Sequence, residues 1–204
     1  MRAVHPIEAE SYRILAERVD LSGFGPLGAA VVARVIHASA DLEYAETMVV
    51  SDEAVAAGVR ALRAGGAVVT DVEMVRHGLV GGSGHCYLAE AVGSSTRTRS
   101  AEGMRIAAEH HPTGAIVVVG CAPTALDEVV RLAATGPFRP ALVIGLPVGF
   151  VGAAEAKAAL RTSGLHAITN VGDKGGSAVA AAAFNAMARI ALAGNADEGM
   201  TDEH

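Results

Sequence analysis

The sequence has no tryptophan, few aromatic residues (3%) and only two cysteines, Cys86 and Cys121, in 204 residues. Two cysteines 35 positions apart provide neither a disulfide framework nor a paired metal-binding motif. No uncharged apolar run is long enough for a membrane-spanning helix, and the N-terminal segment has no apolar signal region. We therefore expect a cytoplasmic protein that holds no metal.

Acidic residues outnumber basic ones, which gives a formal net charge of −6. Only two of the basic residues are lysines. Four acidic residues lie in the C-terminal tail, so the rest of the chain carries only about −2 and has no basic stripe for nucleic acid. We expect the tail, residues 195–204, to be disordered. Its acidic residues are Asp197, Glu198, Asp202 and Glu203.

Apolar residues are abundant, at 51% of the chain, and the mean hydropathy of +0.36 excludes a disordered protein. The length allows one domain with its own core. Short apolar strands are predicted at 48–50, 67–71, 86–89, 115–120, 141–145 and 166–170, with helices between them. This pattern predicts a single-domain α/β fold, residues 1–204, with a mostly parallel sheet and helices on both faces. Ligands in such folds bind beyond the carboxyl ends of the strands.

Prolines at positions suited to the first turn of a helix predict helices at 6–19, 26–38 and 123–134. In the first of these, Ile7, Ile14 and Leu15 form the expected apolar side. Capping residues and glycines bound the remaining helices. These are predicted at 52–64, 72–77, 100–110, 153–161 and 176–193.

Arg34 and His37 are the first candidates for chemistry, because residues three apart share one face of a helix. A cation would then project beside an imidazole, which exchanges protons near neutral pH. The alternative is a structural histidine whose charge favours the C-terminal end of the helix.

Three loops are candidates for binding an anion. Glycines in 120–126 and 145–152 allow close backbone approach, and free N–H groups where the next helix begins favour carboxylates. Neither loop matches a nucleotide-binding fingerprint, so ordinary strand-to-helix turns are the alternative. Segment 94–100 carries Arg97 and Arg99 among hydroxyl side chains, and it is either a carboxylate clamp or a solvated loop.

The other reactive side chains have simpler interpretations. Cys121 follows a strand, and we interpret it as a buried inert thiol rather than a nucleophile. His110 and His111 end a helix and are expected to be a solvated pair. Glu73 is either a pocket acid or an acid at the start of a helix, and Ser177 is a helix cap rather than a nucleophile.

Six segments, in this order along the chain, resemble those of the precorrin-8X methylmutases, and the likeness runs from about residue 6 to 192. The longest is the run Gly-Leu-Pro-Val-Gly-Phe-Val-Gly-Ala at 145–153. The chain departs from the family at Ser95-Thr96-Arg97 and at Cys121. The other five segments are Val35–Ala38, Asp71–Val75, Thr98–Ala101, Ala122–Leu126 and Gly175–Ala178.

The resemblance implies an isomerase of cobalamin biosynthesis that moves a methyl group from carbon 11 to carbon 12 of precorrin-8X, giving hydrogenobyrinate. It implies that His37 donates and accepts the proton and that Ser11, Arg34 and Arg99 bind the substrate. Because the methyl group stays within one molecule, no cofactor is expected. The resemblance also implies a homodimer with the tetrapyrrole site near the subunit interface.

Three alternatives remain at this point. The same methyl shift could act on cobalt-precorrin-8 in the anaerobic branch of the pathway. A non-catalytic tetrapyrrole carrier would bind the product and would not need His37. A generic α/β enzyme would use Cys121 as its nucleophile.

Overall fold

The computed structural model describes residues 5–81 and 84–198. Within these residues the strands form one sheet in the order β1-β6-β5-β4-β2-β3. All neighbouring strands are parallel except β1, which is antiparallel to β6. The predicted α/β fold with a mostly parallel sheet is therefore confirmed. The strands are β1 (Met48–Val50), β2 (Val68–Thr70), β3 (Gly84–Cys86), β4 (Ile116–Val119), β5 (Leu142–Gly145) and β6 (Ala167–Asn170).

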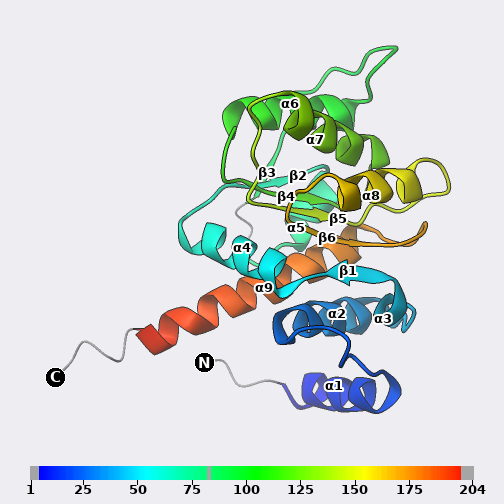
Figure 1. Cartoon of the computed structure of the whole chain (residues 1–204), viewed down its shortest axis with the longest axis vertical. Coiled ribbons are helices and arrows are strands. Elements are labelled where there is room, and N and C mark those ends of the chain that lie inside the picture. Colours follow the sequence, from blue (N-terminus) through cyan, green and yellow to red (C-terminus); the bar gives the residue numbers. More distant parts are fainter. Residues whose placement is uncertain (1–4, 82–83, 199–204) are drawn as a thin grey trace.

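Helices cover both faces of the sheet, as predicted (Figure 1). Helices α6, α7 and α8 lie on one face, and α4, α5 and α9 lie on the other, with α2 and then α1 outside them. The helices are α1 (Pro6–Arg18), α2 (Pro26–Ser39), α3 (Tyr44–Thr47), α4 (Asp52–Arg63), α5 (Glu73–Gly78), α6 (Arg99–His110), α7 (Pro123–Thr135), α8 (Ala153–Thr162) and α9 (Ser177–Glu198).

The central strands are buried on both sides, which explains their uninterrupted apolar sequences. Successive side chains of a strand point to opposite faces. In β4, Val117 and Val119 accordingly belong to the core under α6–α8, while Ile116 and Val118 belong to the core under α4 and α9. The sheet thus has a separate apolar core on each face.

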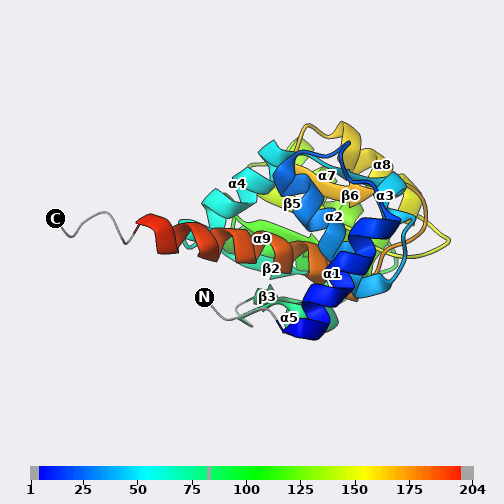
Figure 2. The same cartoon turned by 90° about the horizontal axis from the view of Figure 1, so that it is seen from below.

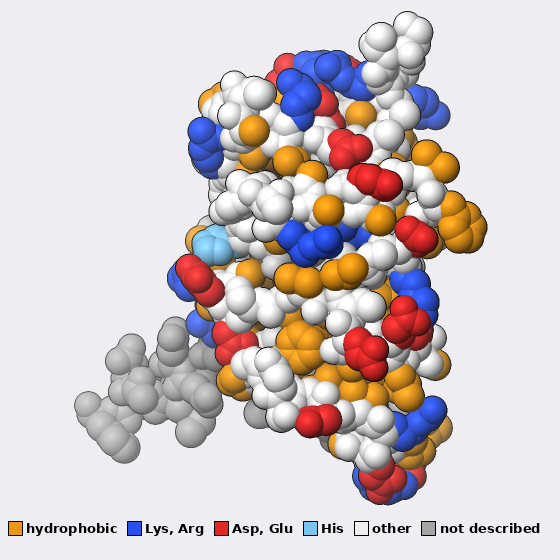
Figure 3. All heavy atoms as spheres, turned by 45° about the vertical axis from the view of Figure 1, so that its right-hand side comes forward, with side chains coloured by type: hydrophobic (Ala, Val, Ile, Leu, Met, Phe, Trp, Pro, Cys, Tyr) orange, Lys and Arg blue, Asp and Glu red, His pale blue; other side chains and the backbone are white. Residues whose placement is uncertain are grey.

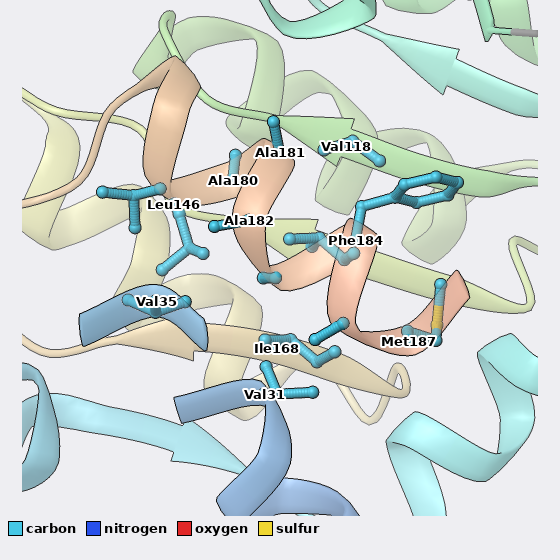
Figure 4. Packing of buried hydrophobic residues seen from close by; sticks show 14 of the residues in the cluster. Val31, Val35, Val118, Leu146, Ile168, Ala180, Ala181, Ala182, Phe184 and Met187 are labelled. Atoms are coloured by element: carbon cyan, nitrogen blue, oxygen red, sulfur yellow. The ribbon is translucent and has the colours of Figure 1, made fainter. Parts of the chain in front are cut away.

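Helix α9 links the sheet to the outer helices, because it packs against β4 and β5 as well as α2, α4 and α5. Its alanines, among them Ala180 and Ala182, lie in this core with Phe184 and Met187 (Figure 4). Small side chains allow the helices to approach closely. A Cβ atom at Gly58 on α4 would lie 2.1 Å from the Met187 sulfur, so this contact requires glycine.

Helix α1 is the outermost layer, and none of its residues is buried. Figure 2, seen from below, shows α1 lying across the outside of the molecule. Two of the three residues predicted on its apolar side are largely open to solvent, since Ile7 is 75% and Ile14 40% exposed. Only Leu15 of the three packs against the core. Helix α1 therefore leaves apolar surface open to solvent.

Most element boundaries agree with the prediction, with a few exceptions. Strand β3 occupies 84–86 rather than 86–89, and the sequence did not predict the short helix α3 or the reversed direction of β1. Helix α9 continues to Glu198 instead of ending at 193. The last part of the predicted disordered tail, residues 199–204, lies outside the described residues. Among the helices that the structure describes, none has the length and hydropathy needed to cross a membrane.

Candidate functional site

Ser11, Arg34 and His37, three of the four predicted site residues, lie together where α1 meets α2. The Oγ atom of Ser11 is 2.9 Å from Nδ1 of His37, which is in the last turn of α2. Arg34, one turn earlier, also faces α1, with its Nη1 atom 4.0 Å from a carboxylate oxygen of Glu8. The predicted common face of Arg34 and His37 is confirmed, and α1 supplies the groups opposite it.

The end of α2 that carries His37 is anchored to the loop between β6 and α9. The C-cap residue of α2 is Ala40, whose φ of 54° is left-handed. In the segment that follows, Asp41 and Glu43 accept hydrogen bonds from Lys174 at 2.6 and 2.7 Å. These hydrogen bonds raise the pKa of Lys174, so the pair of contacts persists through the neutral range. The β6–α9 loop thereby holds the end of α2 in place.

Tyr12 is a site residue that the sequence analysis missed. Its ring is stacked on the imidazole of His37, with the ring centroids 4.8 Å apart and the planes 10° from parallel. Ser11 and Tyr12 follow Glu8 by three and four residues along α1, which places both on the same face as Glu8. That spacing was the available signal, but it becomes informative only when α2 is known to lie opposite.

Two arginines share one carboxylate beside the histidine. Glu8 accepts a hydrogen bond from Arg189 of α9 at 2.9 Å, and this bond holds the pKa of Glu8 below its usual range. Arg34 is the more distant partner at 4.0 Å, and its buried Nε atom has no hydrogen-bond partner in the described residues. The site thus keeps net positive charge and one unused donor, as a carboxylate-rich ligand requires.

An apolar hollow of about 660 Å³ adjoins the site between α1 and α2. Tyr12 links the two, because it lines the hollow and stacks on His37, whereas Ser11, Arg34 and His37 are not among the lining residues. Its walls include the small side chains Ala29, Ala30 and Ala33 of α2. Charged groups beside an apolar surface suit a ligand with an apolar centre and a charged rim.

Arg99, the fourth predicted site residue, is not part of this cluster in one chain. It begins α6, and the sheet separates α6 from α2 (Figure 1). Its guanidinium donates to the carbonyl oxygens of Leu88 and Ala91 at 2.8 and 3.3 Å. Both acceptors are uncharged, and the structure gives Arg99 no ion pair among the described residues, so its positive charge is not neutralised by a carboxylate.

The expectation of free amides in the loop after β4 is wrong. The buried carboxylate of Asp71 accepts hydrogen bonds from the N–H groups of Gly120, Cys121 and Ala122, at 3.1, 2.8 and 2.8 Å. Burial raises the pKa of Asp71, whereas these three donors act in the opposite direction. The protein's own carboxylate therefore occupies the anion site that the sequence predicted for a ligand.

The polar side chains of the segment before α6 mostly contact other residues of the same chain. Arg97 pairs with Glu102 at 2.9 Å. The Thr98 hydroxyl caps α6 by accepting from the Ala101 N–H and lies 2.7 Å from the hydroxyl of Thr124. Capping satisfies N–H groups that the helix itself leaves free. Apart from Arg99, these contacts give the segment a structural role.

The prediction that Cys121 is buried is wrong, because this residue is exposed. Partial desolvation of the thiol, together with the nearby Asp71 carboxylate, raises its pKa, so it stays protonated and weakly nucleophilic at neutral pH. Glu73 is the first residue of α5 and pairs with Arg76 at 2.6 Å, which makes it an acid at a helix start.

His110 and His111 differ in their surroundings. His111 accepts or donates a hydrogen bond of 2.8 Å with the Tyr87 hydroxyl, while His110 is exposed. Burial lowers the pKa of His111, which favours its neutral form. In the part of the chain that is described, no group of three or more His, Cys, Asp or Glu side chains could hold a metal ion.

Comparison with known proteins decides the family. The model of the CbiC family, described as precorrin-8X methylmutase, matches residues 6–190. The chain belongs to the precorrin-8X methylmutase family. It is therefore an isomerase that shifts a methyl group in cobalamin biosynthesis.

Curated relatives agree with this assignment. The cobalt-precorrin-8 methylmutase of Priestia megaterium is 40% identical over 95% of this chain and 91% of its own length. The precorrin-8X methylmutase of Pseudomonas aeruginosa is 37% identical over 89% of this chain and 93% of its own. A crystal structure of the precorrin-8X methylmutase from Thermus thermophilus superposes with a TM-score of 0.80 at 38% identity, covering 93% of this chain and 99% of that one.

Proposed function

We propose that this methylmutase acts on precorrin-8X and moves the methyl group from carbon 11 to carbon 12, with His37 as the proton donor and acceptor. The hydrogen bond between Ser11 and His37, beside the cationic pair Arg34 and Arg189, is the observation that carries the proposal. It brings a titratable imidazole, an orienting hydroxyl and carboxylate-binding groups together along the contact of α1 with α2 and α9.

The reaction requires little covalent chemistry from the protein. The bond from the methyl carbon to carbon 11 breaks and a bond to carbon 12 forms within one conjugated macrocycle, so no group leaves and the formula is unchanged. A proton on the conjugated system draws electron density from the ring and eases migration, and it returns to the histidine afterwards. General acid catalysis of this kind contributes roughly 10²–10⁴ in rate.

The Ser11 contact determines which ring nitrogen of His37 serves the substrate. Because Nδ1 is bound to the Ser11 hydroxyl, Nε2 is the nitrogen that remains for proton exchange. When Nε2 releases or takes up its proton, Nδ1 keeps its own, so the hydrogen bond from Nδ1–H to the Ser11 hydroxyl is present at both stages of the cycle. Ser11 therefore acts in catalysis by orienting the imidazole.

Arg34 is assigned to the carboxylates at the rim of the macrocycle, since its partly exposed guanidinium is only loosely paired, with Glu8 4.0 Å from Nη1. For Arg99 we propose that a second copy of the chain brings its guanidinium to the site, because the sheet separates it from His37 within one chain. This assignment requires the homodimer and a site close to the subunit interface.

Exposed apolar surface supports the homodimer. In the β5–α8 loop, Phe150 is 97% and Val151 88% exposed, and α1 buries none of its residues. On the face drawn in Figure 3, apolar side chains lie open between charged ones over much of the molecule's height. Adjacent apolar side chains that are almost fully exposed, such as Phe150 and Val151, suit a contact with another protein.

Cobalt-precorrin-8 is the second candidate substrate, because relatives named for each substrate are similar to this chain to a comparable degree. A non-catalytic carrier is not favoured, since the family is one of isomerases. Incubating the enzyme with each tetrapyrrole in turn separates the two substrates. Turnover of the cobalt compound alone would overturn the assignment to precorrin-8X.

The central experiment is a spectroscopic assay of His37→Ala. The variant is expected to fold and to bind the tetrapyrrole, while the absorbance change that reports conversion of precorrin-8X is lost. Turnover at the wild-type rate would remove His37 from the mechanism. Circular dichroism of the free variant distinguishes lost chemistry from lost folding.

The dimer has a separate test in native mass spectrometry. The wild type is expected to be a dimer, and Phe150→Ser is expected to raise the dimer dissociation constant by about tenfold or more, as burial of a Phe is worth about 1.5–3 kcal/mol. Because Phe150 is exposed in the single chain, the substitution should leave its fold intact. An active monomeric wild type would contradict the shared site.

A further inference from the structure

We propose that Tyr12 is a positioning residue for catalysis, because its ring face restricts the imidazole of His37 to the orientation that presents Nε2. This inference rests on the proposed role of His37. The supporting geometry is the stack itself, with centroids 4.8 Å apart and planes 10° from parallel. Such stacked arrangements are favourable beyond the burial of surface that they provide.

A hydrogen bond alone does not restrict an imidazole to one orientation. The χ2 torsion of histidine has a broad, roughly two-fold profile, so a partly buried imidazole can tilt and rotate about this torsion. Ser11 restrains one nitrogen of His37 at the ring edge, through a bond of 2.9 Å. Tyr12 restrains the ring face from the same helix. An edge contact and a face contact together leave little freedom for either tilt or rotation.

The position of Tyr12 explains why this restraint has value for catalysis. His37 is only partly buried, and Tyr12, which stacks on it, also lines a hollow of about 660 Å³ between α1 and α2. A mobile imidazole there would spend part of its time turned away from the substrate. Holding the reacting group in the productive geometry before substrate arrives lowers the entropic cost of reaching the transition state.

The ring of Tyr12, rather than its hydroxyl, makes the contact. In the described residues the hydroxyl forms no hydrogen bond, and it is not among the buried polar atoms that lack a partner. The phenol oxygen therefore lies in contact with solvent. Two substitutions therefore test the ring and the hydroxyl separately. Tyr12→Phe keeps the aromatic ring that stacks on His37, whereas Tyr12→Leu keeps apolar bulk but removes the aromatic ring.

The first measurement is an NMR experiment on the free enzyme. Stacking on an aromatic ring shifts the His37 carbon-bound protons upfield, and the signals are assigned by their absence in His37→Ala. The shift is expected in wild type and Tyr12→Phe and is expected to be lost in Tyr12→Leu. Absence of the shift in wild type would overturn the inference whatever the activities are.

The second measurement is steady-state kinetics with precorrin-8X. Tyr12→Leu is expected to lower kcat by about three- to tenfold, the equivalent of one aromatic pair, with KM within about twofold of wild type. Tyr12→Phe is expected to recover kcat to within about twofold. Glu17→Gln, at an exposed charged position of α1 that pairs with Arg13 on the same helix, is the control for general effects on this helix.

The outcomes separate this inference from the proposed function. If His37→Ala is inactive but Tyr12→Leu turns over at the wild-type rate, His37 keeps its role and the inference for Tyr12 is wrong. An equal loss in Tyr12→Phe and Tyr12→Leu would also contradict it, because the hydroxyl would then be the active group. If His37→Ala is fully active, the proposed function fails and the role of Tyr12 fails with it.

Discussion

The hydroxyl of Ser11 and the Nδ1 atom of His37 lie 2.9 Å apart across the contact between α1 and α2. The two residues belong to the outermost helix and to the one beneath it. Because α1 has no buried residue, its attachment depends on a few contacts of this kind. The geometry of the proposed site and the packing of α1 on α2 are therefore coupled.

Ser11→Ala is expected to lower kcat by about two- to tenfold, since a net hydrogen bond is worth about 0.5–1.5 kcal/mol. The reason is that an unrestrained Nδ1 permits both ring orientations. Single-turnover absorbance measurements at saturating substrate report this step directly. Ser11→Thr, which keeps a hydroxyl, provides the matched variant. Equal rates for wild type and Ser11→Ala would exclude an orienting role.

Arg34→Ala is expected to raise the dissociation constant for the tetrapyrrole by about 10- to 100-fold, as charge-assisted hydrogen bonds contribute about 1.5–3 kcal/mol. Titration followed by absorbance measures this affinity. Arg13→Ala removes an arginine of α1 that pairs with Glu10 and Glu17 on its own helix, and it should bind like wild type. Equal weakening in both variants would point to a general charge effect rather than a contact.

Asp71→Asn is expected to lower the free energy of unfolding by about 2–3 kcal/mol, because an amide group would face N–H donors that need an acceptor. The amide NH2 group would face either the N–H of Gly120, which one oxygen of Asp71 accepts, or the N–H groups of Cys121 and Ala122, which the other accepts. Urea unfolding followed by circular dichroism measures the change. Asp127→Asn is the control, since the structure gives the Asp127 carboxylate no side-chain hydrogen bond among the described residues, and burial and the nearby Glu155 raise its pKa. A change below about 0.5 kcal/mol in Asp71→Asn would show that its carboxylate does not hold this loop.

Lys157 gives the protein a pH-dependent stability. Its side chain is fully buried and donates to Asn170 and to the carbonyl of Lys174 at 2.9 and 2.6 Å. Burial lowers its pKa to about 8 from 10.5. Between these two values the unfolded chain binds more protons than the folded one, so stability rises with pH.

The free energy of unfolding of the wild type is therefore expected to rise by about 2 kcal/mol between about pH 7.5 and about pH 9.5, relative to Lys157→Met. Urea titrations at both pH values measure it. Lys174→Met is the control, because the pKa of Lys174 is raised and its contribution is constant over this window. Parallel pH profiles for wild type and Lys157→Met would refute the assignment.

The strands and most helices were predictable because their signals are local. An uninterrupted run such as Ile116–Val119 needs burial on both sides, and a proline such as Pro26 suits only the start of a helix. The common face of Arg34 and His37 follows from helical periodicity in the same way. The segment at 86–89 was misplaced because its signal is short and its neighbours are glycines.

The sequence by itself determined the α/β class and the family, and it predicted His37 as the centre of the proposed site. The tertiary structure decided that α1 lies against His37 and that Arg189 donates a hydrogen bond to Glu8, 181 positions away in the sequence. It also decided that the Asp71 carboxylate accepts hydrogen bonds from the N–H groups of the β4–α7 loop. It also decided that the sheet lies between Arg99 and His37. Periodicity fixes which side chains share a face of one helix or strand. Which faces meet depends on the packing of the whole chain, and no local pattern encodes that.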